Sequence, residues 1–234
     1  MRVSVRWKAA LALGAMLLAS GVSAGEARAA GLTAPPRVKP AAIVVLGDSL
    51  SAEYGLPRGT GWVALLRERV AATRADYSVA NASISGDTTS GGRARLGALL
   101  QRLQPAVLIV ELGGNDALRG VPLSTTEDNL RTIILQAQQQ GAKVVLVGMQ
   151  VPPNYGPDYS QKFQQLYRTL AQTLRVPLVP FLLAGMETRA ELFQADQIHP
   201  SQEAQPLLLN NVWPVLQPVL KAARTSAAAT VKTH

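Results

Sequence analysis

The 234-residue chain contains no cysteine, which excludes disulfide bonds, thiol nucleophiles and metal sites built on thiolates. Histidine is nearly absent too, and because His234 is the last residue, only His199 lies inside the chain as a candidate base. The sequence has neither a carboxylate–imidazole cluster nor a glycine-rich phosphate loop, so we expect no metal and no nucleotide cofactor. Its chemistry must therefore use oxygen and nitrogen groups.

Acidic residues are missing from both ends of the chain. Of the formal net charge of +8, three positive charges lie before residue 25 and three after residue 220, which leaves +2 for residues 25–220. This middle part offers no basic stripe for a phosphate backbone, so we expect no nucleic-acid partner. With 47% hydrophobic and 16% charged residues, the composition is typical of a globular protein.

Residues 1–24 have the three parts of a secretory signal peptide: basic residues, the apolar run 9–19 and the small-residue ending Val22-Ser23-Ala24. The apolar run is too short to span a bilayer, which takes about 20 residues. A second possible cleavage site follows at residues 29–30. We expect an exported chain, periplasmic or secreted, with no integral membrane segment in its mature form.

The remaining chain divides into three parts by composition. Residues 25–40 read as a linker, residues 41–220 are long enough for one domain with a single core, and residues 221–234 form an Ala-rich basic tail that we expect to be disordered. Nothing in the sequence demands a partner protein, and we expect a monomer.

Short runs of β-branched and apolar residues alternate with helical periodicity from residue 41 onward, a pattern typical of βαβ units around a parallel sheet. Several runs are apolar at consecutive positions, which fits strands covered by helices on both faces. The pattern predicts an α/β fold, a three-layer, doubly wound, five-stranded parallel sheet. The expected strands are 43–46, 77–80, 107–111, 144–149 and 178–179.

Helices are predicted between the strands, because leucines and other apolar residues recur there at i, i+3, i+4 and i+7. Ser124 and Glu127 have the spacing of a capping box at the start of one of these helices. A final helix is expected from about Ser201 towards Trp213, with Pro206 kinking or delaying it. The apolar stripes that define four of the helices are Trp62/Leu65/Leu66/Val70, Leu96/Leu99/Leu100/Leu103, Leu130/Ile133/Ile134/Ala137 and Phe163/Leu166/Tyr167/Leu170.

In a doubly wound sheet, sites form beyond the carboxyl ends of the strands, and polar segments follow three of them. These segments are Gly47-Asp48-Ser49, Ser85-Gly86-Asp87 and Gly114-Asn115-Asp116. Each has an ordinary interpretation as a turn or a helix cap. The fourth polar segment, Asp196-Gln197-Ile198-His199-Pro200, places an acid and the internal histidine three residues apart, as a base and its orienting carboxylate require.

Together, the four segments resemble the blocks of the SGNH, or GDSL-type, hydrolase family. The similarity is closest to the bacterial group of acyl-CoA thioesterases, lysophospholipases and arylesterases, and it covers nearly all of residues 42–218. It implies a flavodoxin-like fold and hydrolysis of esters and thioesters through an acyl-serine intermediate. It also implies the catalytic residues Ser49, Asp196 and His199, and an oxyanion hole made of the Ser49 and Gly86 N–H groups and the Asn115 side chain.

The resemblance further implies an acyl or aryl groove lined by Leu118, Val121, Val151 and Pro153. Because acyl-CoA is cytoplasmic, an exported enzyme would meet lysophospholipids or other esters. A carbohydrate O-acetylesterase and a catalytically silent secreted binding module are the alternatives. One position departs from the group: Glu53 stands where glycine is usual, and reads either as a charge that repels anionic headgroups or as a solvated carboxylate in a first helical turn.

Overall fold

The computed structural model describes the backbone of residues 40–231 and, apart from Pro153, the side chains as far as Lys221. The predicted leader and all but the last residue of the predicted linker lie outside the described residues. Within 40–231, no helix combines the length and the hydrophobicity that a membrane crossing requires.

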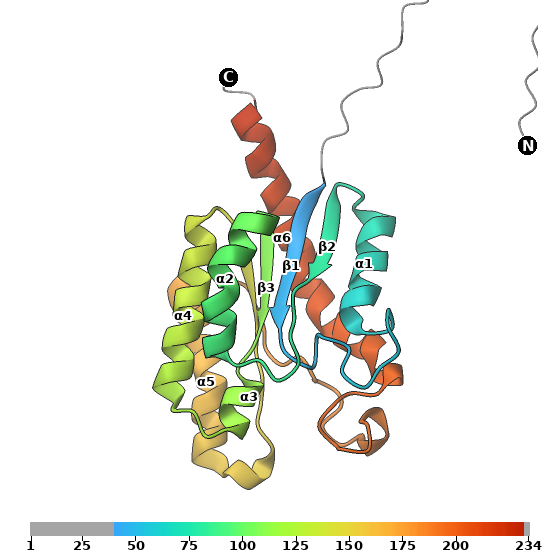
Figure 1. The fold of residues 1–234 in the computed structure, drawn as a ribbon, viewed down its shortest axis with the longest axis vertical. Coiled ribbons are helices and arrows are strands. Elements are labelled where there is room, and N and C mark those ends of the chain that lie inside the picture. The colour runs from blue at the N-terminus through green and yellow to red at the C-terminus, as the bar shows by residue number, and fades with distance from the viewer. Residues whose placement is uncertain (1–39, 232–234) are drawn as a thin grey trace, which may run out of the picture. The chain divides into compact units, whose positions relative to one another are not determined.

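Five parallel strands form one sheet in the order β2-β1-β3-β4-β5, with β1 and β3 at its centre. Figure 1 shows the strands running side by side with their carboxyl ends at the lower edge. This is the predicted doubly wound sheet, and its order is the flavodoxin-like one. The strands are β1 (Ala41–Gly47), β2 (Tyr77–Asn81), β3 (Val107–Glu111), β4 (Lys143–Val147) and β5 (Leu178–Val179).

Helices cover both faces of the sheet, as consecutive apolar strand residues require. On one face α2 packs against α4 and α4 against α5, while α1 and α6 pack together on the other (Figure 1). Every residue of β3 and five of the seven in β1 are buried between these layers. The helices are α1 (Trp62–Thr73), α2 (Thr89–Leu103), α3 (Gly114–Leu118), α4 (Leu123–Gln139), α5 (Pro157–Leu174) and α6 (Gln205–Val231), with three short 3₁₀ turns, η1 (Pro153–Tyr155), η2 (Ala190–Leu192) and η3 (Gln202–Ala204).

Two local predictions are wrong. The capping box at Ser124 does not form, because α4 already begins at Leu123 behind Pro122 and no side chain caps it. Glu127 instead pairs with Arg131 one turn further on. The fourth strand ends at Val147 and not at residue 149, because Gly148 turns to lie against the Pro180 carbonyl, where a Cβ would come within 2.5 Å of the oxygen.

The last helix begins later and continues further than expected. The turn η3 precedes it, so Pro206 falls in its first turn, where the missing N–H has no helical partner to lose. Helix α6 then continues to Val231 through most of the tail that we expected to be disordered. Alanine is the best helix former, so an Ala-rich segment readily extends a helix that is already nucleated.

Candidate active site

Strand β1 ends in the middle of the sheet, and this places Ser49 between the segments that follow β2 and β3. The Gly86 loop follows β2, and α3, which carries Asn115, follows β3. Parallel strands bring all three segments to the same edge, next to the point where the strand order reverses. The segment with Asp196 and His199 joins them from between β5 and α6, 150 residues away from Ser49.

His199 connects Ser49 to Asp196. Its Nε2 lies 2.8 Å from Ser49 Oγ, and its Nδ1 lies 2.7 Å from Asp196 Oδ2. A carboxylate only accepts hydrogen bonds, so the Nδ1 proton points to Asp196 and Nε2 keeps a lone pair for the serine hydroxyl. The other carboxylate oxygen, Oδ1, accepts the backbone N–H groups of Ile198 and His199, each at 3.0 Å.

Three hydrogen bonds therefore converge on Asp196, and they lower its pKa from 3.8 to about 2, with the His199 backbone N–H as the main cause. The acid stays ionised at any pH where an imidazole base is neutral. Asp196 is exposed to solvent while the His199 side chain is mostly buried, so the hydrogen bonds, and not burial, fix the orientation of the carboxylate.

The N–H groups of Ser49 and Gly86 donate to no other group among residues 40–231. Gly86 has φ of 78°, a left-handed conformation that glycine adopts without strain. Asn115 donates one N–H of its side-chain amide to Asp48 Oδ2 at 2.9 Å, which leaves the second N–H available. From the sequence, these three groups are the expected donors of an oxyanion hole.

Two carboxyl groups are buried directly beneath the turn that carries Ser49. Glu111, at the end of β3, accepts the Ser51 hydroxyl at 2.7 Å and the Asp48 N–H at 3.3 Å, and Gly47 leaves room for it because a Cβ there would come within 2.7 Å of Oε2. Burial raises the pKa of Asp48 from 3.8 to about 6 and that of Glu111 well above its usual range. The turn that carries Ser49 therefore packs on two carboxyl groups whose burial disfavours ionisation.

The acids that follow Gly86 and Asn115 hold local structure. Asp87 accepts the Thr88 N–H and pairs with Arg95. Asp116 accepts both the N–H and the hydroxyl of Thr89 and so fixes the start of α2.

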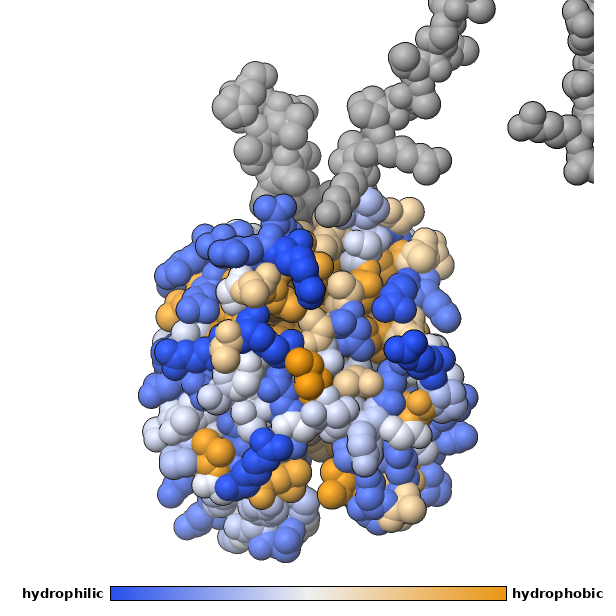
Figure 2. Space-filling model, viewed as in Figure 1, coloured by the Kyte–Doolittle hydropathy of each residue, from blue (hydrophilic) through white to orange (hydrophobic). Residues whose placement is uncertain are grey.

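The residues expected to line a groove lie on two segments at this same edge. Leu118 ends α3 and is half exposed, and Val121 follows it. Val151 and Pro153 lie between β4 and α5, with Pro153 opening η1. Figure 2 shows a notch in the lower edge of the molecule, where the strands end in Figure 1, with apolar residues on both of its sides.

Glu53 does not lie in a first helical turn, as one of its two interpretations had it. It lies in a chain of turns and not in a helix, and its φ of 61° explains why glycine suits this position. Its carboxylate accepts the N–H groups of Gly59 and Gly61 at 3.0–3.1 Å and holds the loop between β1 and α1. The charge is thus engaged within its own loop.

Two residues beside Ser49 and His199 were not predicted from the sequence. The Tyr54 ring lies beside the His199 imidazole, with 4.3 Å between the ring centroids. Gln194 donates its side-chain amide to the Tyr54 and Pro200 carbonyls, so it ties the serine loop to the histidine loop. The only signal in the sequence for either role is that Tyr54 lies close to Ser49, and Gln194 close to His199, along the chain.

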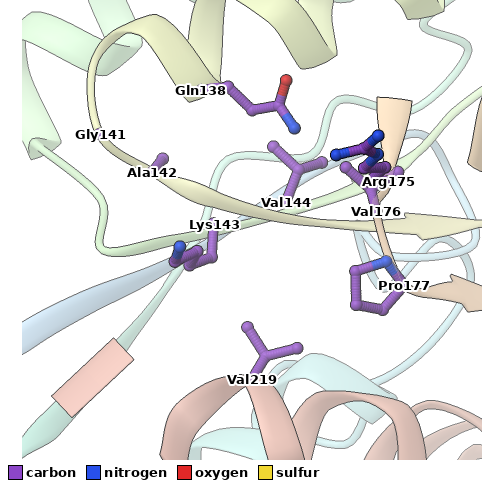
Figure 3. Close-up of a pocket in the computed structure, with 9 residues that line it drawn as sticks. All are labelled: Gln138, Gly141, Ala142, Lys143, Val144, Arg175, Val176, Pro177 and Val219. Atoms are coloured by element: carbon purple, nitrogen blue, oxygen red, sulfur yellow. The ribbon is translucent and has the colours of Figure 1, made fainter. Parts of the chain in front are cut away.

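A separate hollow of about 480 Å³ lies at the opposite edge of the sheet, around the amino ends of β4 and β5 (Figure 3). Its lining contains none of the residues that surround Ser49. The residues are Gln138, Gly141, Ala142, Lys143, Val144, Arg175, Val176, Pro177 and Val219.

The protein has a parallel sheet between two layers of helices, and at the carboxyl edge of that sheet a histidine is hydrogen-bonded to both a serine and an aspartate. This fold and this arrangement define an ester hydrolase of the SGNH class. Residues 45–206 match the model of the GDSL-like lipase/acylhydrolase family, and the chain belongs to that family. Esterase TesA of Pseudomonas aeruginosa is 51% identical over 178 residues, covering 76% of this chain and 89% of that protein. Thioesterase 1/protease 1/lysophospholipase L1 of Escherichia coli is 41% identical, covering 76% of this chain and 84% of that protein.

Solved structures agree with this assignment. The crystal structure of TesA matches with a TM-score of 0.74 and 50% identity, covering 76% of this chain and 99% of that one. The esterase EstA of Pseudoalteromonas sp., solved in a form inhibited by monoethylphosphonate, matches with a TM-score of 0.73 and 37% identity, covering 77% and 98%. The protein is thus an enzyme that hydrolyses ester bonds, with the predicted fold.

Proposed function

We propose that Ser49 is the nucleophile, His199 the general base and Asp196 its orienting acid in the hydrolysis of carboxylic esters and thioesters. The observation that carries the proposal is the continuous pair of hydrogen bonds from Ser49 Oγ to Nε2 and from Nδ1 to Asp196. Relatives named as an esterase, an arylesterase and a thioesterase/lysophospholipase support the bond type.

In the first step, Nε2 accepts the proton of Ser49 as Oγ attacks the carbonyl carbon of the substrate. The carbonyl π electrons move to its oxygen, which the N–H groups of Ser49 and Gly86 and the Asn115 amide stabilise. The imidazolium then returns the proton to the leaving alcohol or thiol, and acyl-Ser49 remains. Water attacks this ester by the same sequence and releases the acid and the free enzyme.

We infer that the substrate carries an apolar acyl or aryl group. Five large apolar side chains are exposed within the described part of the chain, and four of them, Tyr54, Ile84, Leu118 and Ile198, belong to the segments that carry the proposed catalytic groups. Single exposed apolar residues are ordinary, but a gathering at one site favours an apolar ligand. Leu118, Val121, Val151 and Pro153 would line the groove, and a lysophospholipid is the substrate that export favours.

Initial rates on p-nitrophenyl esters from acetate to palmitate, with a lysophospholipid alongside, test the proposal. We expect a maximum beyond acetate and at least a ~10³-fold loss for Ser49→Ala and for His199→Ala, with a smaller loss for Asp196→Asn. A fluorophosphonate should add to Ser49 as detected by mass spectrometry. An unlabelled Ser49, or wild-type rates in His199→Ala, would contradict the mechanism, and a maximum at acetate would indicate an acetylesterase.

We propose further that residues 1–24 direct export and that the mature enzyme is a monomer. The basic, apolar and small-residue parts of the leader support export. Mass spectrometry of enzyme recovered from a periplasmic extract should find a new N-terminus at Gly25 or near Ala30, and light scattering should give the mass of one chain. An intact Met1 in that extract would contradict cleavage.

A further inference from the structure

Two arginines hold the loop that carries Gly86, and the mechanism uses neither of them. Arg95, on α2, lies beneath the loop. Its Nε and one amino group contact the carboxylate of Asp87, the residue directly after Gly86, at 2.8 and 2.7 Å. The same guanidinium also donates to the carbonyls of Ala82, which follows β2, and Gly47, which ends β1.

The second arginine holds the loop from the solvent side. Arg119 follows the last residue of α3 and donates from Nη2 to the Gly86 carbonyl at 2.8 Å. Because α3 also carries Asn115, one short helix supplies one of the proposed oxyanion donors and restrains the loop that supplies another.

We propose that Arg95 and Arg119 are positioning residues that fix the turn of residues 84–87, whose Ser85–Gly86 peptide carries the proposed oxyanion donor. The Gly86 N–H has no acceptor among the described residues, and the turn that presents it is closed by the Asp87 N–H, which donates to the Ile84 carbonyl at 3.0 Å, so whatever holds Asp87 and the Gly86 carbonyl in place also sets the direction of that N–H. Arg95 fixes the peptide that follows Gly86 through Asp87 and ties it to the ends of β1 and β2. Arg119 fixes the Gly86 carbonyl relative to Asn115. This inference rests on the proposed oxyanion hole.

A positioning role predicts a particular kinetic signature. A misdirected donor weakens binding of the tetrahedral transition state and leaves binding of the planar ester almost unchanged, so kcat falls while KM stays. An arginine that served instead to bind an anionic substrate would alter KM, and only for charged esters. Arg119 is exposed, so both roles are open to it and the substrate's charge distinguishes them.

The experiment compares Arg119→Met, Arg119→Lys, Arg95→Met and Arg95→Lys in the full chain. Arg102→Met is the control, because Arg102 is exposed two turns further along α2 and lies away from the loop's hydrogen bonds. Each variant is assayed with a neutral and an anionic p-nitrophenyl ester and with an alkyl boronic acid, which forms a tetrahedral adduct with serine. Thermal unfolding is recorded for each, and Arg119→Met and Arg95→Lys keep the test valid if Arg95→Met fails to fold.

For Arg119→Met we expect kcat to fall about tenfold on both esters, with KM within about twofold of wild type, and for the Arg95 variants a loss of about 10–100-fold. The inhibition constant of the boronic acid should rise by the same factor as kcat/KM falls, and Arg119→Lys should recover part of the loss. Arg102→Met should match wild type. Unchanged kcat in Arg119→Met and Arg95→Lys, or a loss confined to KM for the anionic ester, would overturn the inference.

Asn115→Ala separates this outcome from a failure of the proposed function. If Asn115→Ala loses boronic acid affinity while the arginine variants keep it, the oxyanion hole stands and the positioning role falls. If Asn115→Ala also retains wild-type kcat and affinity, the proposed oxyanion hole itself is wrong.

Discussion

At the residue scale, Asp48 decides which end of the Asn115 amide faces the substrate. Its carboxylate has no proton to give when ionised, so it selects the NH₂ end of Asn115 and excludes the carbonyl end. Its other oxygen accepts the Leu50 N–H at 3.0 Å and shapes the turn around Ser49. One acid thereby arranges both the proposed nucleophile and a proposed oxyanion donor.

Replacing this acid with an amide should therefore damage catalysis without a large change in shape. In Asp48→Asn the new side chain both donates and accepts, so Asn115 can turn its carbonyl towards the oxyanion, and we expect kcat to fall ~10²-fold. Asn115→Ala should lose a similar factor, and the double variant should lose little more, because both changes remove the same donor. Losses that multiply in the double variant would contradict this coupling.

The buried charge of Asp48 should also make stability depend on pH. Its pKa is about 6 in the folded protein against 3.8 in an open chain, so between about pH 4 and pH 6 the folded state binds the proton more tightly. The free energy of unfolding therefore falls as pH rises through this window, by an amount on the order of 3 kcal/mol. Asp196 acts in the opposite sense, and lower down: its stabilisation is present above about pH 4 and is lost as pH falls towards 2.

Urea unfolding of wild type and Asp48→Asn at pH 4.5 and 7.5 isolates the contribution of Asp48 together with its effect on the pKa of Glu111, which the Asp48 charge raises, because groups remote from Asp48 cancel in the difference. We expect the variant to gain stability relative to wild type as pH rises. Parallel dependence on pH in the two proteins would show that Asp48 is not the group that titrates.

The sequence could indicate the proposed triad and oxyanion donors because the blocks that resemble the family follow strands or precede a helix. It could not supply Arg95 or Gln194. Their partners are mostly backbone carbonyls, which every residue possesses, so no residue pattern marks the contact. Contacts of this kind are visible only when the loops lie together in space.

At the scale of elements, the segment between β1 and α1 depends on Glu53. Its left-handed backbone costs about 1 kcal/mol in a non-glycine residue, and its carboxylate offsets that cost by binding the Gly59 and Gly61 N–H groups. Gly61 is equally constrained, since a Cβ there would meet Glu53 Cγ at 2.6 Å. The carboxylate and the glycine form one small unit.

Glu53→Gly and Glu53→Ala should consequently differ. Glycine removes the backbone strain together with the hydrogen bonds, so its stability should stay within about 0.5 kcal/mol of wild type. Alanine keeps the strain and loses the bonds, at a cost of about 1–2 kcal/mol. Denaturant unfolding measures both, and equal stabilities for the two variants would refute this account.

Helices and strands could be predicted from the sequence where burial alone decides the structure. Their ends could not be predicted where local contacts override the pattern. All five strands are recovered because their apolar runs lie under helices, whereas the start of α4 follows Pro122 and not the Ser124 motif. Alternation of strand and helix likewise predicts the class of sheet. The exact ends of β4 and α6 depend on contacts that periodicity does not report.

At the scale of the whole molecule, Val219 and Leu220 are the last core residues among the side chains described. Both side chains are buried, and the Leu220 carbonyl accepts bonds from Arg74 and from the Tyr77 hydroxyl at 3.1 and 3.0 Å. Among the side chains that the structure describes, which end at Lys221, none beyond Leu220 belongs to the buried cluster.

A chain that stops after Lys221 should therefore match the full chain in kcat and, within about 0.5 kcal/mol, in stability. A chain that stops after Leu216 should lose about 2–5 kcal/mol or fail to fold, because it lacks the Leu220 side chain and carbonyl. Thermal unfolding of both chains is the measurement. A marked loss in the longer one would mean that residues 222–234 contribute to the fold.

The contacts of Tyr77 also bear on how the enzyme can be immobilised or fused to another protein. Tyr77 pairs with Ala41 at the start of β1 and holds Leu220 near the end of the domain, so both ends of the domain meet at the amino edge of the sheet. Ser49 and His199 lie at the other edge. A resin, a fusion partner or a membrane anchor joined at either end of the domain would leave the edge with Ser49 and His199 facing away from the support and accessible to molecules in solution.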